Sequence, residues 1–234
     1  MNKRLLLWLL PLIFSNPVLI AQTTDFNGIK IFINPGHGGY DSNDRHILAT
    51  DFWESEGNLV KGLYLRDLLE NLNATVYMSR TSNSSDGDLP LSVIDEMANA
   101  ANVDFFLSIH SNGWDGTQNL PLMLFRGYDD QPVFTDAKIM AEILWQKLYE
   151  KGNCWTGSNQ YVKGDWTFYP QWGDKVGLGV LRTLTCREFF QKVHFMIIYL
   201  SHGVYAIQTS FIMSHGHFFV HSYRFTKKHL WNMG

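Results

Sequence analysis

The chain has 234 residues, a formal net charge of −3, 45% hydrophobic residues and 18% charged residues. This length and composition are those of an ordinary globular protein with enough residues for one full hydrophobic core. The slightly acidic balance argues against the basic surface with which proteins bind nucleic acid, so no nucleic-acid partner is expected.

Residues 1–21 have the pattern of a secretory signal peptide. Lys3 and Arg4 precede the apolar run Leu5–Phe14, and Ala21 offers a small residue for cleavage. The alternative is a membrane anchor, but the apolar run is short for a span of the bilayer. We therefore predict an exported protein, periplasmic or secreted, without a stable membrane anchor.

Apolar periodicity along the rest of the chain predicts alternating strands and helices. The expected elements are strands at residues 29–33, 74–78 and 105–109 and helices at residues 57–72, 91–101 and 136–149. This alternation is typical of the α/β class: three layers, with a twisted, mostly parallel sheet flanked by helices. Ligands of such sheets gather at the carboxyl ends of the strands.

Three side chains are expected at that edge of the sheet. His37, in Asn34-Pro-Gly-His-Gly-Gly39, follows the first strand, His110 directly follows the third, and Glu54 lies at the start of the first helix. Two imidazoles and one carboxylate are a three-ligand zinc set that leaves a position open for water, as in hydrolases. A metal held there polarises a carbonyl and lowers the pKa of a bound water. Glu56 is an alternative to Glu54 as the third metal ligand.

Aromatic residues are frequent between residues 150 and 180. They form either a wall that contacts sugar or peptide, or ordinary packing under a long loop, and the sequence leaves both interpretations open. The residues concerned are Trp155, Tyr161, Trp166, Tyr169 and Trp172.

Several motifs together resemble the zinc-dependent N-acetylmuramoyl-L-alanine amidases. Besides the histidine motif near the N-terminus, they are Glu54 with Asn58 four residues later, Ala98-Asn-Ala-Ala-Asn102 and Ser108-Ile-His-Ser-Asn112. The resemblance runs from about Ile29 to about Thr185, and it implies an amidase-like zinc domain over residues 27–185.

The resemblance also implies a site and a reaction. Zn²⁺ would be held by His37, Glu54 and His110, and Glu54 is preferred to Glu56 because the family's ligand glutamate precedes the matching asparagine by four positions. The enzyme implied is exported and acts on peptidoglycan, where it hydrolyses the amide between N-acetylmuramic acid and L-alanine. The oligomeric state is left unknown.

The match to this family ends after Thr185. Residues 186–234 contain six of the nine histidines but only one of the 22 acidic residues, Glu188. Amidases of this family use a second glutamate near the C-terminus as acid and base, and no residue here matches it. Glu188 is a weak candidate because its context, Cys186-Arg-Glu-Phe-Phe190, differs from the family pattern. The catalytic acid/base residue is therefore left unknown.

A frameshift just after Thr185 is one explanation for the aberrant tail. One permitted back-translation of residues 191–203, read one base earlier, gives Ser-Glu-Gly-Ser-Phe-His-Asp-Tyr-Ile-Pro-Glu-Ser-Trp, which resembles the family's continuation. On this hypothesis residues 186–234 are out of frame, and the last strand and helix of the fold are disrupted. The alternative to an active amidase is then an impaired or dead fragment that binds zinc or peptidoglycan without turnover.

Overall fold

The computed structural model describes residues 25–40, 53–112, 121–151 and 161–184, together with the backbone of residues 194–201, 207–214 and 217–224. The predicted signal peptide lies outside these residues, so it stays a prediction. No helix in the described part of the chain is long and apolar enough to cross a membrane.

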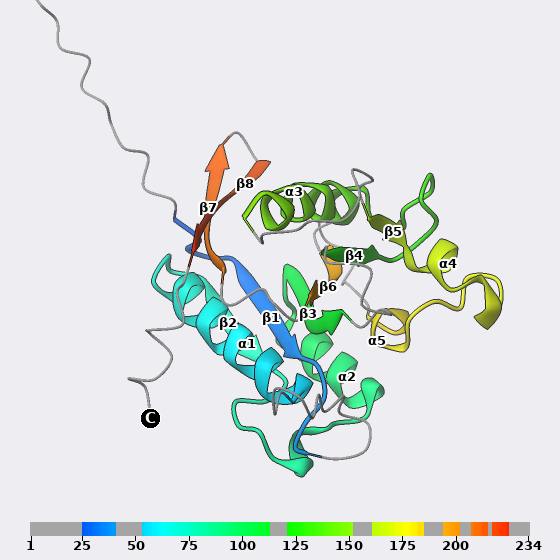
Figure 1. Cartoon of the computed structure of the whole chain (residues 1–234), viewed down its shortest axis with the longest axis horizontal. Coiled ribbons are helices and arrows are strands. Elements are labelled where there is room, and N and C mark those ends of the chain that lie inside the picture. The colour runs from blue at the N-terminus through cyan, green and yellow to red at the C-terminus, as the bar shows by residue number, and fades with distance from the viewer. Residues whose placement is uncertain are drawn as a thin grey trace, which may run out of the picture.

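A six-stranded sheet with the order β2-β1-β3-β6-β4-β5 forms the centre of the molecule (Figure 1). Strands β2, β1, β3 and β6 are mutually parallel, whereas β4 runs antiparallel to β6, and β5 is parallel to β4. The strands are β1 (Lys30–Pro35), β2 (Thr75–Met78), β3 (Phe105–Asn112), β4 (Leu122–Phe125), β5 (Val162–Gly164) and β6 (His194–Ser201).

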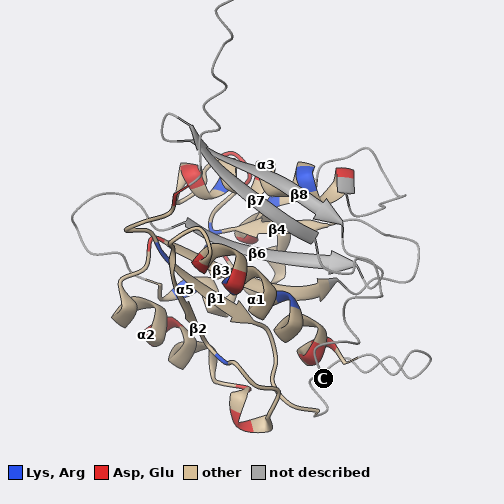
Figure 2. Cartoon of the chain, turned by 90° about the vertical axis from the view of Figure 1, so that its left-hand side faces the viewer, with Lys and Arg blue, Asp and Glu red and all other residues tan. Residues whose placement is uncertain are grey.

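Helices cover both faces of this sheet. On one face α1 (Glu54–Glu70) and α3 (Thr135–Lys151) pack on the strand residues that point toward them. On the other face α2 (Leu91–Ala101) and α5 (Gly179–Arg182) pack on Phe32 and its neighbours. Successive strand residues point to opposite faces, so a sheet covered on both sides is apolar throughout its central strands. Figure 2 shows acidic and basic residues interspersed along the helices seen from one side.

Three shorter helical segments complete the described elements before the tail. They are η1 (Ser85–Gly87), α4 (Asp165–Phe168) and η2 (Pro170–Trp172).

The predicted α/β class with a largely parallel sheet is confirmed, and most predicted elements lie where the periodicity placed them. The helix predicted at 91–101 coincides with α2, and α1 begins at Glu54. One detail is wrong: His110 lies inside β3, not after it, because that strand continues to Asn112. Strand β4 was not predicted because its four residues are all buried and show no alternation.

The tail contributes strands to the fold. Strand β6 pairs with β3 along its whole length, from Phe105 opposite His194 to Asn112 opposite Ser201. A hairpin of β7 (Ile207–Ser214) and β8 (His217–Arg224) lies against α1 and α3 (Figure 1). The sheet position beside β3 is thus filled, while beyond Leu184 the described segments include no helix. The out-of-frame origin of these residues stays a hypothesis.

Candidate metal centre

The loop after β1 brings His37 to the carboxyl edge of the sheet. The amide of Gly36 donates a hydrogen bond to the carbonyl of Ile109 (2.9 Å), which ties this loop to β3. His37 itself has a φ of 63°, a left-handed conformation that is uncommon for residues other than glycine and that clusters at functional sites. A Cβ at Gly36 would lie 2.1 Å from Cε1 of His110, so only glycine allows this approach.

Glu54 is buried beside this loop as the first residue of α1, with 2% of its surface exposed. Its Oε1 accepts hydrogen bonds from the Ser111 amide (2.9 Å) and from Nδ2 of Asn58 (3.4 Å). Asn58 Nδ2 also donates to the carbonyl of Gly36 at 3.2 Å. The carboxylate is therefore held in a fixed orientation at a helix N-terminus, where negative charge is favourable.

The two histidines and Glu54 converge on one point. Oε1 of Glu54 lies 3.3 Å from Nδ1 of His110 and 3.6 Å from Nε2 of His37. The two imidazole rings meet edge to face, with 5.0 Å between their centroids. One potential ligand atom from each of the three residues lies within 4.8 Å of the other two. Tetrahedral ligands at zinc–ligand distances of ~2.0–2.2 Å are about 3.4 Å apart, so this donor set fits a zinc ion.

The electrostatics of Glu54 and His110 suit a cation. Burial would raise the pKa of Glu54, but hydrogen bonds with His110 and His37 and from the Ser111 amide outweigh burial and hold that pKa well below its ordinary value. Burial lowers the pKa of His110, although Glu54 opposes the shift. A carboxylate and neutral imidazoles are the deprotonated donors that a metal requires.

Arg80 joins the two segments that carry the first two candidate ligands. Its guanidinium, which is buried, donates to the carbonyls of Pro35 (2.9 Å), Gly36 (3.1 Å) and Ser55 (2.6 Å). These bonds connect the end of β1 with the first turn of α1. Arg80 was not predicted, because a single arginine after a strand gives no sequence signal of such a role.

The other predicted site residues do not enter this cluster. Glu56 is exposed on α1, whereas Glu54 lies beside the two histidines. Glu188 lies outside the described residues.

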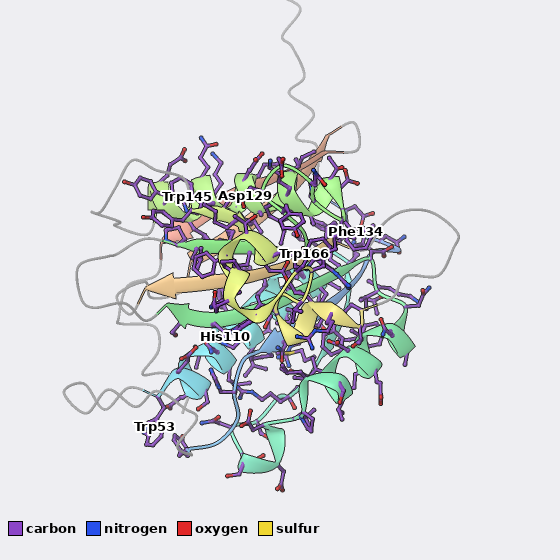
Figure 3. The ribbon with its side chains drawn as sticks, turned by 90° about the vertical axis from the view of Figure 1, so that its right-hand side faces the viewer. Trp53, His110, Asp129, Phe134, Trp145 and Trp166 are labelled. Carbon is purple, nitrogen blue, oxygen red and sulfur yellow. The ribbon has the colours of Figure 1, made fainter. Side chains whose placement is uncertain are left out.

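The aromatic residues after β5 lie away from the metal centre. Strand β5 runs opposite to β3, so α4 and η2 follow it at the sheet edge opposite His110. In Figure 3, Trp166 and Phe134 lie to the right of His110, and the β3 arrow points to the left. Trp166 contacts Tyr128 edge to face, and Tyr169 stacks on Trp172 at 4.0 Å. Trp155 lies outside the described residues, and Tyr161 packs against the core.

Fold and site together define a class: a three-layer α/β protein with a candidate mononuclear metal centre at the carboxyl edge of a mostly parallel sheet. Residues 31–148 match the family model described as N-acetylmuramoyl-L-alanine amidase. The chain belongs to this family.

Two curated relatives are similar to part of the chain. N-acetylmuramoyl-L-alanine amidase CwlM of Bacillus licheniformis is 41% identical over 91 residues, which are 38% of this chain and 34% of that protein. The sporulation-specific N-acetylmuramoyl-L-alanine amidase of Bacillus subtilis is 37% identical over 94 residues, 38% of this chain and 33% of the relative. The match thus spans about a third of each relative.

Solved structures show the same fold. The chain is similar to Cwp6 from Clostridium difficile with a TM-score of 0.58 and 23% identity, covering 73% of this chain and 24% of that one. It is also similar to the apo form of the amidase Ami1 from Mycobacterium abscessus, with a TM-score of 0.56, 14% identity, and coverage of 74% and 84%. At these identities the likeness supports the three-layer fold alone.

Proposed function

We propose that this chain is a zinc-dependent amidase that hydrolyses the amide between N-acetylmuramic acid and L-alanine in peptidoglycan. The observation that carries the proposal is the cluster of His37, Glu54 and His110, whose potential ligand atoms lie within 4.8 Å of one another in a member of this family.

The chemistry follows from the donor set. Zinc in such a site supplies a Lewis acid that polarises the amide carbonyl and lowers the pKa of a bound water. Three protein ligands leave a fourth coordination position for water or substrate. The protein's part is to fix the donors: Asn58 and the Ser111 amide hold the Glu54 carboxylate, as outer partners do in metal sites generally.

A second candidate function is zinc or peptidoglycan binding without turnover. Strand β6 runs beside β3 to the carboxyl edge of the sheet, where the candidate metal centre lies. There the register pairs the segment Tyr199–Ser201 of β6 with the segment His110–Asn112 of β3. No residue of β6 is acidic. Loss of a positioned general acid or base lowers rates by about 10²–10⁴-fold, so an amidase that lacks this group would be slow.

The decisive experiment compares two carboxylates of one helix. Zinc content of the purified chain is measured by elemental analysis, and release of stem peptide from purified peptidoglycan by labelling of the new L-alanine amino group. We expect bound zinc in the wild type, and loss of zinc and of any activity in Glu54→Gln. Glu56→Gln, a matched control on the exposed side of α1, keeps both.

The possible results separate the two functions. Zinc with stem-peptide release supports the amidase, whereas zinc without release supports the non-catalytic binder. Absence of zinc from the wild type would contradict the amidase and zinc binding without turnover, and an equal loss in Glu56→Gln would contradict the assignment of Glu54.

We also propose that the protein is exported, because the proposed substrate is the cell wall and residues 1–21 have the pattern of a signal peptide. Amino-terminal sequencing of protein from the periplasm or medium is expected to begin near Gln22. An intact Met1 on cell-associated protein would contradict export by cleavage.

A further inference from the structure

A lysine borders the candidate metal centre on the helix that carries Glu54. Lys61 lies seven residues, about two turns, after Glu54 and therefore on the same face of α1. Its Nζ donates hydrogen bonds to Oγ of Ser111 (3.0 Å) and to Oδ1 of Asn58 (3.3 Å). Both partners also bind Oε1 of Glu54, Asn58 through its amide group and Ser111 through its backbone N–H. On each of these two paths, a single residue lies between the Lys61 ammonium and the Glu54 carboxylate.

Lys61 has no direct ion pair in the described part of the chain. Among the described side chains, no carboxylate lies within salt-bridge distance of its Nζ, and Glu54 acts on it through space. Burial lowers the pKa of Lys61 to about 8, with Glu54 opposing the shift, so the group is mainly protonated at neutral pH. A positive charge is therefore held beside a site that fits a divalent cation.

We propose that Lys61 balances the charge of Glu54, so that a metal ion at this centre is bound less tightly but keeps more of its positive charge toward the substrate. This inference rests on the metal site of the proposed function. Two neutral imidazoles and one carboxylate give the donor set a single negative charge, and the Lys61 ammonium offsets it. Lys61 is thus a positioning residue, which acts through Asn58 and Ser111 and through the field at the metal.

The direction of the effect distinguishes charge balance from simple structural support. Removing a cation from the neighbourhood of a metal ion relieves repulsion, which is strong where the effective dielectric is low. Zinc is then bound more tightly. Removing a residue that only supports the site loosens the ligands, and zinc is bound more weakly.

The test measures zinc affinity of the full chain by competition with a chromophoric chelator at pH 7. Two neutral variants are compared: Lys61→Met keeps the aliphatic stem, and Lys61→Gln keeps a hydrogen-bond donor for Ser111 and Asn58. Lys61→Arg keeps the charge. Lys147→Met is the matched control, because Lys147 lies on α3 rather than α1 and pairs at the surface with Glu150 (3.4 Å).

We expect both neutral variants to bind zinc about ten-fold more tightly than the wild type. Lys61→Arg and Lys147→Met are expected to match the wild type. Unchanged or weaker binding in the variants Lys61→Gln and Lys61→Met overturns the proposal. If the wild type binds zinc but releases no stem peptide, the proposed amidase function fails while this inference is still decided by the affinities. If the wild type binds no zinc, both are overturned.

Discussion

The backbone beside His37 passes so close to His110 that the identity of residue 36 controls the geometry of the site. A Cβ at position 36 would overlap the His110 imidazole, and three of its ring atoms lie within 2.6 Å of the ideal Cβ position. We predict that Gly36→Ala displaces this imidazole from Glu54 and lowers zinc affinity by about 10–100-fold, as disturbance around metal ligands typically does.

Chelator competition measures this loss, and Gly28→Ala is its control. Gly28 has a positive φ of 84°, which Gly36 does not, and a Cβ there meets nothing within 4 Å. The control therefore tests backbone strain without a clash, and its zinc affinity is expected to be normal. Wild-type affinity in Gly36→Ala would show that the His110 ring is not held where the structure places it.

Arg80 offers a second test at the scale of one residue. Lysine cannot reproduce the planar guanidinium that reaches the carbonyls of Pro35, Gly36 and Ser55 together. We expect Arg80→Lys to lower the free energy of unfolding by about 2–4 kcal/mol, because buried carbonyls lose their donors. Urea unfolding of the metal-free protein measures the change.

The matched control is Arg66→Lys, a half-exposed arginine that pairs with Asp67 on the surface of α1. Surface pairs of this kind contribute about 0–1 kcal/mol, so the control is expected to unfold almost like the wild type. Equal effects of the two substitutions would contradict the connection between β1 and α1 that we assign to Arg80.

At the scale of elements, α2 is fastened to the segment after α5 by a buried carboxyl group. Oδ2 of Asp95 makes a short hydrogen bond with the Thr183 hydroxyl, and Asn99 donates to the Thr183 carbonyl at 3.1 Å. Oδ1 of Asp95 is buried without a hydrogen-bond partner among the described residues. Burial raises the pKa of Asp95 to about 6, although bonds from Thr183 and the charge of Arg126 oppose the shift.

This raised pKa makes the contact sensitive to pH. The folded protein holds the Asp95 proton to a higher pH than the unfolded chain, so the stabilisation is fully present below about pH 4 and is lost as the pH rises through about 6. Asn at this position stays neutral. The wild type loses this stabilisation between pH 4.5 and pH 7.5, whereas Asp95→Asn does not. We therefore expect the free energy of unfolding of Asp95→Asn, measured with urea relative to the wild type, to be about 1–3 kcal/mol more favourable at pH 7.5 than at pH 4.5. The same difference at both pH values would exclude a raised pKa.

Elements with local periodicity were predictable from the sequence, and elements defined by distant partners were not. The helix at 91–101 has a clear apolar face, and its predicted bounds are the observed bounds of α2. Strand β3 extends through His110 because β6 pairs with it as far as Ser201, a contact that no local pattern encodes. The same holds for the site. His37, Glu54 and His110 lie in recognisable motifs, whereas Arg80 and Lys61 reach the site through bonds to distant segments, such as Gly36 for Arg80 and Ser111 for Lys61.

The hairpin of β7 and β8 lies against α1 and α3, the two helices that border an apolar groove over one face of the sheet. This groove between α1 and α3 is lined entirely by apolar side chains: Phe26, Ile31, Leu69, Phe105, Leu107, Met140 and Leu144. The hairpin contacts both helices. A parallel sheet is stable when both of its faces are covered. Truncation after Ser201 is therefore expected to increase binding of a hydrophobic dye and to lower the melting temperature. Unchanged dye binding would show that the hairpin does not shield this face.

Restoring the hypothesised reading frame after Thr185 tests the origin of the tail and the missing acid/base group together. All three candidate ligands precede Thr185, so the present and restored chains are expected to bind zinc with equal affinity. Their rates should differ, because the restored strand would carry a glutamate toward the metal edge, where this chain places Tyr199 opposite His110. We expect stem-peptide release to rise by about 10²–10⁴-fold in the restored chain, the usual contribution of a positioned acid or base. Equal rates in the two chains would contradict the acid/base role of the restored glutamate. A family-like continuation found only in the present frame of close relatives' genes would refute the frameshift.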